Sequence, residues 1–506
     1  MFYRLYSQIE QQLEKIYFDS RLNRLVQVLP TTHNKIITAF VQQCLKFDLL
    51  SYGGLQHTSE TTVKERRFDI LAFVLNSEIF TYSIFKYCFV QLLYRLIVKQ
   101  NPRYIIDKND MKFVFVNSAG GVDRLASIIH GSFHKDICLM LYLFTSFPKK
   151  IFERTKKNPE IGFIPPGLPN KKAIQKCLIF LFKDGHNFTS KLLCLFNHYP
   201  LSLKLQIVTA ITKYYYALLI YHSWAEENAL KLAAAYPNAL FIFDLDEAGK
   251  ELLLADSLNR LGKKTLVIQH GILTDAKRYI PTCSYMACNS ERDRQALISE
   301  GVGAKKLYVT GQPLQTIEDS IPSDKKSMIS YPILILAGAG PIWLQRNYVK
   351  MLKRSQYLKS YPHTFMRIHP AMDAKQQRIW LFNKNLKPTD PKESLRECIS
   401  KCQFIITFSI DALVVAVRQQ RPTIVCIPES FFFPAWHNFL KTVPMVKLVK
   451  NPCMLDEALE DKNFLNDQQN DLSDSQWRYV DYAFGDLNTK VNLTKLMNQL
   501  VAEYEI

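Results

Sequence analysis

Apolar and polar positions follow two different periods along this chain, and the change from one to the other marks its parts. Up to about residue 108 the apolar residues recur at helical spacing without a strand–turn–helix unit, which predicts a helical N-terminal region at residues 1–108. From Lys112 the continuous apolar run KFVFVN is followed by the turn SAGGVD and the helical pattern RLASIIHG. Strand, glycine turn and helix in this order open a doubly wound parallel sheet.

A regular alternation of strands and helices follows. We expect a buried strand at 137–144, a long helix at about 203–235, a strand at 239–245 and an amphipathic helix that ends at Gly262. Three more strands are expected in KKTLVIQHG, SYMACNS and KLYVTGQP. The Lys-, Pro- and Phe-rich residues 148–200 interrupt this rhythm and indicate an insertion or a segment that faces an acceptor.

A linker rich in Pro, Ser, Asp and Lys at residues 313–331 separates this series from a second one. The second series has strands in PILILAGAG, TFMRIHP, CQFIITFS and RPTIVCIP, a helix in IDALVVAVRQQ and a closing helix in NLTKLMNQLVAEYEI. The predicted fold class is therefore α/β, with Rossmann-like domains at 109–318 (insertion at about 148–200) and 319–506. Because such sheets bind ligands at the carboxyl ends of their strands, we expect the two domains to face a cleft.

The charge of the chain adds a possible partner. The formal net charge is +18. The densest basic stretch is interleaved with phenylalanines and consists of Lys149, Lys150, Arg154, Lys156, Lys157, Lys171, Lys172 and Lys176. It suits an anionic lipid surface or an anionic polymer, and a merely solvated basic face is the alternative. No zinc knuckle, helix-turn-helix or RNP-like pattern is found, so no nucleic-acid partner is expected.

Cysteine usage and targeting signals favour a cytoplasmic protein. The 11 cysteines form no CxxC pair, and Cys398 and Cys402 are expected on one helix without zinc-ligand partners. No stretch offers the ~18 uninterrupted apolar residues of a spanning helix, and the N-terminus lacks the pattern of a signal peptide. We expect no metal and no bound cofactor.

Candidate ligand-binding residues follow two strands of the second series. Gly338-Ala339-Gly340 is a strand-to-helix turn at which a ligand could approach the backbone, although it lacks a complete dinucleotide fingerprint and a P-loop lysine. Arg367 and His369 alternate on one strand, so they point to the same face, where they could bind an anionic phosphate. Pro370 fixes the exit from that strand.

A third candidate stands at a predicted helix start. Thr407 and Ser409 directly precede the helix that begins near Asp411. Hydroxyl groups and free backbone amides at a helix N-terminus bind anions, and ordinary N-capping is the alternative explanation.

The first series offers groups for proton transfer. His270 stands in Gln269-His270-Gly271 at a strand end, where it could act as a base or bind a phosphate; a structural histidine is the alternative. Asp246 and Glu247 follow the strand ALFIFDL, and a carboxylate there could deprotonate or hold an acceptor hydroxyl. Acidic residues are equally favoured in the first turn of a helix.

The order of these pieces is more specific than any one of them. QHG, then KLYVTGQP, then RIHP and ITFSIDALVVAVRQQRPTIVCIP resemble the GT-B glycosyltransferases of bacterial surface-polysaccharide assembly over about residues 239–430. That group includes capsule polymerases, polysialyltransferases, CDP-glycerol glycerophosphotransferases and, more distantly, UDP-GlcNAc 2-epimerases. The resemblance implies a GT-B fold, in which two Rossmann-like domains face a cleft, here with the additional helical N-terminal region.

The resemblance also implies roles for individual residues. His369 and Pro370 fall on an HP motif that contacts the donor phosphate, and Ser409 with Thr407 falls on a serine/threonine motif that binds the same nucleotide. Asp246, Glu247 and Gly249 partly match a motif whose carboxylate is the catalytic base, with Ala248 inserted before the glycine. Asp411 and Ala412 stand where many GT-B enzymes have a Glu-Ala pair.

The implied function is transfer of a sugar from a nucleotide-activated donor to a surface polysaccharide or lipid-linked glycan. The HP motif slightly favours a CMP-sugar such as a nonulosonate or Kdo. A carboxylate or His270 would be the base, while Arg367, His369 and the helix end at Ser409 would stabilise the departing phosphate. Such a protein would work in the cytoplasm, with peripheral attachment to the inner face of the membrane suggested by its charge. The alternatives are a CDP-alditol glycerophosphotransferase-like polymerase and a non-catalytic polysaccharide-assembly scaffold.

Overall fold

A computed structural model gives the structure of the chain. It describes residues 2–19, 30–45, 69–98, 111–117, 138–143, 161–164, 171–244, 249–269, 271–273, 276–312, 330–338, 342–361, 363–369, 372, 374–381, 386–408, 411–427, 434–465, 472–485 and 488–503.

The first sheet has seven parallel strands in the order β3-β2-β1-β4-β5-β6-β7. Its central strands are continuous apolar runs because both faces are covered: β4 is buried along its whole length. The winding direction reverses between β1 and β4, as in a doubly wound sheet. The strands are β1 (Phe113–Asn117), β2 (Cys138–Leu143), β3 (Ile161–Ile164), β4 (Leu240–Phe243), β5 (Thr265–Ile268), β6 (Tyr285–Cys288) and β7 (Leu307–Val309).

The second sheet has six parallel strands in the order β10-β9-β8-β11-β12-β13, with the same reversal between β8 and β11. Its strands are β8 (Tyr331–Ala337), β9 (Thr364–Ile368), β10 (Leu386–Pro388), β11 (Cys402–Thr407), β12 (Thr423–Cys426) and β13 (Val446–Val449). Its helices are α11 (Ile342–Arg354), α12 (Gln356–Ser360), α13 (Ala374–Leu381), α14 (Leu395–Ser400), α15 (Asp411–Arg418), α16 (Pro434–Thr442), α17 (Pro452–Glu460), α18 (Lys462–Leu465) and α19 (Asp474–Phe484).

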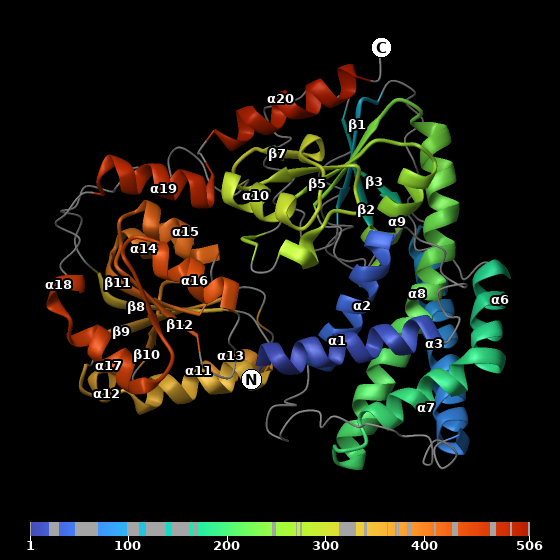
Figure 1. Ribbon diagram of the computed structural model, residues 1–506, viewed down its shortest axis with the longest axis horizontal. Coiled ribbons are helices and arrows are strands. Elements are labelled where there is room, and N and C mark those ends of the chain that lie inside the picture. The colour runs from blue at the N-terminus through green and yellow to red at the C-terminus, as the bar shows by residue number, and fades with distance from the viewer. Residues whose placement is uncertain are drawn as a thin grey trace.

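The first half contains many helices. They are α1 (Phe2–Asp19), α2 (Pro30–Leu45), α3 (Asp69–Val98), α6 (Lys171–Ile179), η5 (Phe180–Asp184), α7 (Gly185–Leu195), α8 (Leu201–Ala235), α9 (Gly249–Arg260), η6 (Ala276–Tyr279), α10 (Glu291–Ser299) and η7 (Ala304–Lys306). Those of the N-terminal region pack beside α8, with α2 and α3 in contact with it (Figure 1). Aromatic rings join several of these helices: Phe180 lies 4.6 Å from Tyr215, and Phe188 lies 5.4 Å from the same ring. Among the described helices, none combines the length and the apolar character that crossing a bilayer requires.

The last helix, α20 (Thr489–Ala502), leaves the second half and packs on the first sheet (Figure 1). Its apolar side chains Leu493, Met497 and Leu500 are buried in one cluster with Phe113 and Leu240 of β1 and β4. The two halves are therefore joined twice along the chain, once through residues 313–329 and once through the segment that leads into α20.

Two parallel sheets covered by helices, with helices α1–α3 before them, confirm the predicted α/β class, its two Rossmann-like sheets and the helical N-terminal region. The predicted strands of both series and the long helix at about 203–235 are present. Three edge strands were not predicted: β3, β10 and β13. The residues described within 148–200 form β3 and the helical segments α6, η5 and α7.

Candidate functional site

Three neighbouring strand ends of the second sheet bring predicted ligand residues together. β8 lies between β9 and β11, and Thr407 at the end of β11 pairs with Leu336 of β8. The His369 amide, just beyond β9, donates to the Ala337 carbonyl at 3.2 Å. Gly338 follows Ala337, so Gly338, His369 and Thr407 lie at one edge of the sheet, where its winding reverses. This switch point is the place where doubly wound sheets bind nucleotides.

Buried contacts fix the backbone at this edge. The Gln345 side chain, buried on α11, donates to the Gly338 carbonyl at 2.5 Å and accepts from the Trp380 indole at 2.6 Å. Phe408, which follows Thr407, packs against Tyr348 with 4.0 Å between the ring centres. The strand ends are therefore held before any ligand arrives, which reduces the entropic cost of binding.

The Arg367 side chain contacts α14, a helix of the second half. Its guanidinium donates to the Cys398 thiol of α14 at 3.2 Å, and this thiol in turn donates to Glu393 at 3.4 Å. Glu393 also accepts from Lys401 at 2.7 Å and from the Tyr331 hydroxyl at 2.5 Å, and these hydrogen bonds hold the pKa of Glu393 below its ordinary value. A contact of Arg367 with a phosphate stays a prediction.

Other predicted site residues lie outside the described residues. They are Asp246, Glu247, His270, Gly340, Pro370 and Ser409. The residues before and after His270 in the chain, Gln269 and Gly271, are described.

Gln269 and Gly271 are held by amide side chains that are themselves buried. The Gln269 amide nitrogen donates to the Gly271 carbonyl at 2.8 Å and to the Asp293 carboxylate at 2.6 Å. The Asn289 side chain donates to the same Gly271 carbonyl at 2.7 Å. Gly271 has a φ of 69°, a conformation that favours glycine. Burial raises the pKa of Asp293 to about 6.

This turn also touches the second half of the molecule. Ile272 is buried in one cluster with Leu413 and Val417 of α15, the helix that starts after Thr407 and Ser409. The Arg292 guanidinium of α10 lies 3.7 Å from the centre of the Phe439 ring of α16. Ile272, two residues after the candidate base His270, and α15, the helix after Thr407, therefore meet at the contact between the halves.

The sequence did not indicate the charged pair that starts α9. The predicted amphipathic helix forms, but every residue from 250 to 258 is buried, so it has no solvated face there. α8 covers the side that the polar residues were expected to expose, and the Lys250 ammonium lies 4.8 Å from the Tyr221 ring of α8. The nearby Asp244, at the end of β4, is buried as well.

Burial disfavours the charged forms of Lys250 and Glu251 and so shifts the pKa of each. It raises the pKa of Glu251 to about 7, and the charge of Asp244 raises it further. It lowers the pKa of Lys250 to about 8. A carboxylate with a pKa near 7 in the first turn of α9, the helix that follows β4 in the chain, is a candidate for general base catalysis. The only signal in the sequence was a Lys-Glu pair directly before the apolar run LLLA.

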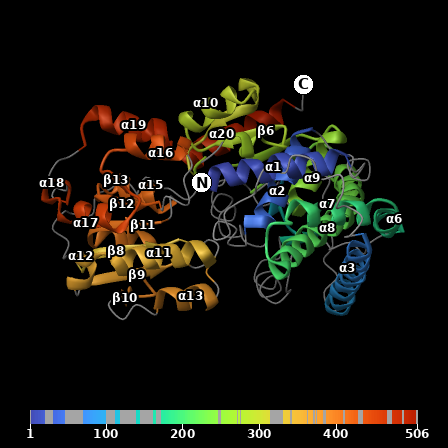
Figure 2. The same cartoon turned by 60° about the horizontal axis from the view of Figure 1, so that its bottom comes forward.

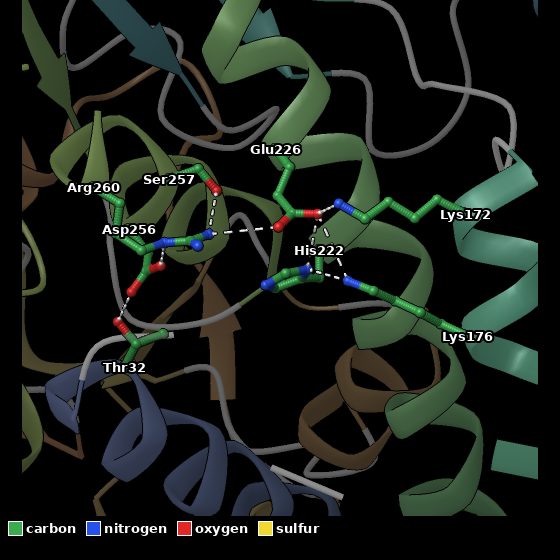
Figure 3. A network of polar contacts seen from close by, with 8 residues as sticks. All are labelled: Thr32, Lys172, Lys176, His222, Glu226, Asp256, Ser257 and Arg260. Carbon is green, nitrogen blue, oxygen red and sulfur yellow. Dashed lines mark hydrogen bonds and ion pairs between the residues drawn. The ribbon is translucent and has the colours of Figure 1, made fainter. Parts of the chain in front are cut away.

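A second polar network holds α2, α6, α8 and α9 together (Figure 3). Glu226 of α8 accepts from Lys172 at 3.0 Å and lies 3.6 Å from the Lys176 ammonium. Arg260 lies 4.0 Å from Glu226 and 2.9 Å from Asp256. Two lysines of the predicted basic stretch are thus paired within the protein. The network also includes His222, Ser257 and Thr32.

The cysteines differ from one sequence expectation. Cys398 lies on α14, but Cys402 is the first residue of β11, so the prediction that they share a helix was wrong: the helix ends at Ser400. Burial raises the pKa of Cys402 to about 12, which leaves an unreactive thiol. Within the part of the chain that the structure describes, no three His, Cys, Asp or Glu side chains gather as metal ligands.

Comparisons with known proteins give structural likenesses only. No protein-family model matches the chain, and no curated protein matches its sequence. The chain is similar to UDP-GlcNAc 2-epimerase of Methanocaldococcus jannaschii, solved with UDP-GlcNAc and UDP (15% identity, TM-score 0.47, covering 77% of this chain and 100% of that one). It is also similar to UDP-GlcNAc 2-epimerase of Neisseria meningitidis bound to UDP-GlcNAc (14%, 0.46, 78% and 100%).

A third similar structure is the lipopolysaccharide outer core galactosyltransferase WaaB in its apo form (12% identity, TM-score 0.41, covering 77% of this chain and 100% of that one). Two of these three proteins are named as epimerases and one as a galactosyltransferase.

Proposed function

We propose that this protein is a glycosyltransferase that binds a nucleotide-activated sugar at the switch point of the second sheet. The observation that carries the proposal is the meeting of Gly338, His369 and Thr407 on three neighbouring strand ends next to the start of α15. Strand ends at a switch point bind nucleotides, and a helix N-terminus stabilises phosphate.

Both halves of the molecule would contribute residues to the reaction. The acceptor hydroxyl attacks the anomeric carbon of the donor sugar, the bond from that carbon to the phosphate oxygen breaks, and the nucleotide leaves with its negative charge. His369 and the backbone amides at the start of α15 stabilise that charge. The proton of the hydroxyl passes to a base from the first half. The candidates are Asp246, Glu247 and His270 and, from the structure, Glu251.

The favoured donor is a CMP-sugar such as a nonulosonate or Kdo, and the favoured acceptor is a surface polysaccharide, such as capsule, or a lipid-linked glycan. The support is the position of His369 beside the Gly338 turn, together with the HP and serine/threonine motifs in the sequence. Transfer would take place in the cytoplasm at the inner face of the membrane. No metal or cofactor is assigned a role.

A thermal-shift screen with CMP, CDP, UDP, GDP and their sugar conjugates tests the donor site. A ligand at a hundredfold excess over its Kd stabilises the folded state by about 2.7 kcal/mol, which raises the melting temperature. We expect the shift with one nucleotide to be lost in His369→Ala. It should persist in His363→Ala, because His363 lies at the opposite end of β9, just before its first residue.

The outcomes separate the proposed reaction from its alternatives. A shift with one cytidine nucleotide, lost only in His369→Ala, followed by sugar transfer from the matching CMP-sugar, would support the proposal. Transfer of an alditol phosphate from a CDP-alditol would replace it with the polymerase alternative. No shift with any nucleotide, or equal shifts in both variants, would contradict the assigned donor site and favour a scaffold.

A further inference from the structure

Helices α3 and α6 lie at the outer end of the first half, far from the second sheet in both views (Figures 1 and 2), and both carry exposed apolar side chains. On α3, Leu71, Val74, Tyr82 and Phe85 are exposed at spacings of three, eight and three residues, which keeps them on one side of the helix. The opposite face of α3 carries buried residues such as Ile79. These four positions thus form one stripe along the helix, and Phe73, which is also exposed, lies outside it.

A second stripe is on α6 and η5, which follow it in the same end of the molecule. Ile174, Leu178 and Phe182 are exposed and lie four residues apart, while Ala173 and Cys177 on the inner side are buried. η5 contacts α3, so the two helical segments are neighbours. Phe85 and Phe182 are the most exposed, at 70% and 68%. Single exposed apolar residues are common, but two helical stripes of them mark an interaction surface.

Positive charge surrounds these stripes. The Lys213 ammonium lies 4.4 Å from the centre of the Tyr82 ring. Among the described side chains of α3, α6 and η5, exposed lysines outnumber exposed carboxylates, the one exposed carboxylate being Glu78. The exposed lysines are Lys86, Lys171 and Lys183, together with Lys172, whose charge is paired with Glu226. A partner must therefore offer an apolar interior together with a negatively charged surface.

The network of Figure 3 keeps α6 in place for this contact. Lys172 and Lys176 reach inward to Glu226 of α8, and Cys177 packs below them, so the outward side of α6 is left to Ile174 and its neighbours. The apolar side chains are held on rigid helices before any partner binds, which lowers the entropic cost of docking.

We propose that α3, α6 and η5 form a docking surface for an anionic lipid membrane, with Phe85 and Phe182 entering the boundary between headgroups and acyl chains. Helices with apolar residues on one side and lysines beside them bind anionic bilayers in this way. The inference names the partner that would present the lipid-linked acceptor, and so it deepens the proposed function. The surface itself is argued from exposure and charge and needs no nucleotide.

Co-sedimentation with phospholipid vesicles tests the surface. The full chain should bind vesicles of phosphatidylglycerol and phosphatidylethanolamine, bind phosphatidylcholine vesicles far less, and lose binding as salt is added. Phe85→Ser with Phe182→Ser should weaken binding about tenfold, since two large apolar side chains no longer enter the membrane. The control is Tyr482→Ser, an exposed aromatic residue of the second half, which should bind as the wild type does.

A second measurement keeps Phe85 and Phe182 in place and uses a fluorescent label. Cys88 on α3 and Cys453 on α17 are both exposed and can carry an environment-sensitive fluorophore, each with the other changed to serine. The label at Cys88 should shift to the blue when anionic vesicles are added, and the label at Cys453 should not.

Three results would overturn the proposal: no binding of the wild type to anionic vesicles, equal binding of the double phenylalanine variant, or no shift of the Cys88 label. Concentration-dependent self-association that disappears in the double variant, without vesicle binding, would assign the surface to a second copy of this chain. Because vesicles are used without nucleotide, failure here leaves the donor-site result of His369→Ala unaffected.

Discussion

Replacing Glu251 by Gln should make the protein more stable at alkaline pH and leave its stability unchanged in acid. Glu251 is buried at the start of α9, and its pKa is raised from the ordinary 4.5 to about 7 because burial disfavours its charged form. The folded protein thus holds this proton more tightly than the unfolded chain does. The contribution to stability is complete below pH ~4.5 and is lost as the pH rises through about 7.

The size of the effect follows from the two pKa values. Each tenfold difference in proton affinity is worth about 1.4 kcal/mol, so the wild type loses about 3 kcal/mol of unfolding free energy across this range. Glutamine keeps the shape of the protonated acid and has no proton to lose. At about pH 8.5, where the buried Lys250 with its pKa of about 8 has largely lost its charge, the variant should be about 3 kcal/mol more stable than the wild type.

Urea unfolding at about pH 5 and about pH 8.5 measures this difference, with the midpoints converted by the measured slopes. Glu300→Gln is the control, because Glu300 is exposed at the end of α10 and its replacement should change stability by the same small amount at both pH values. An equal difference between Glu251→Gln and wild type at both pH values would refute the reasoning. So would a variant that is less stable at high pH, because Glu251 would then be ionised and paired in the folded state.

Two further predictions concern a glycine that has no room for a side chain and a buried hydrogen bond of Gln269. A Cβ atom on Gly485 would lie 1.8 Å from the Asn289 carbonyl oxygen, so Gly485→Ala should fail to give soluble protein or lower the melting temperature strongly. Gly262→Ala, with a similar positive φ but no atom within 4 Å, should cost only about 1 kcal/mol in a melting experiment. Gln269→Leu removes the amide that Asp293 accepts from and should lower the unfolding free energy by about 2 kcal/mol in urea titration; an unchanged midpoint would show that the hydrogen bond is replaced.

The sequence predicted the strands that are buried on both faces. Runs such as KFVFVN and TLVI are long enough to be recognised and are bounded by turns, and they became β1 and β5. The edge strands were missed for the opposite reason. β10 is only three residues long and ends in a proline. β13, VKLV, contains a lysine and only its last residue is fully buried, because edge strands are covered on fewer sides.

The candidate site shows the same division. Gly338, His369 and Thr407 could be found because each follows a recognisable strand, and parallel strands place their ends at one edge. Glu251 could not be found in this way, because its raised pKa results from burial. That burial depends on the packing of α8 against α9, which the residues around Glu251 in the sequence do not reveal. The hydrogen bond from Arg367 to Cys398 also depends on where α14 packs. The alternation of residues along the strand predicted only the face of the sheet on which Arg367 lies.

The return of α20 to the first sheet sets an order of events during synthesis. One face of β1 and β4 is covered by Leu493, Met497 and Leu500, which leave the ribosome only after the whole second half has been made. Until then, apolar side chains of the first sheet remain uncovered and open to aggregation. A nascent chain of this protein therefore needs protection for almost the full time of translation, and the first half reaches its final packing only when the second is already present.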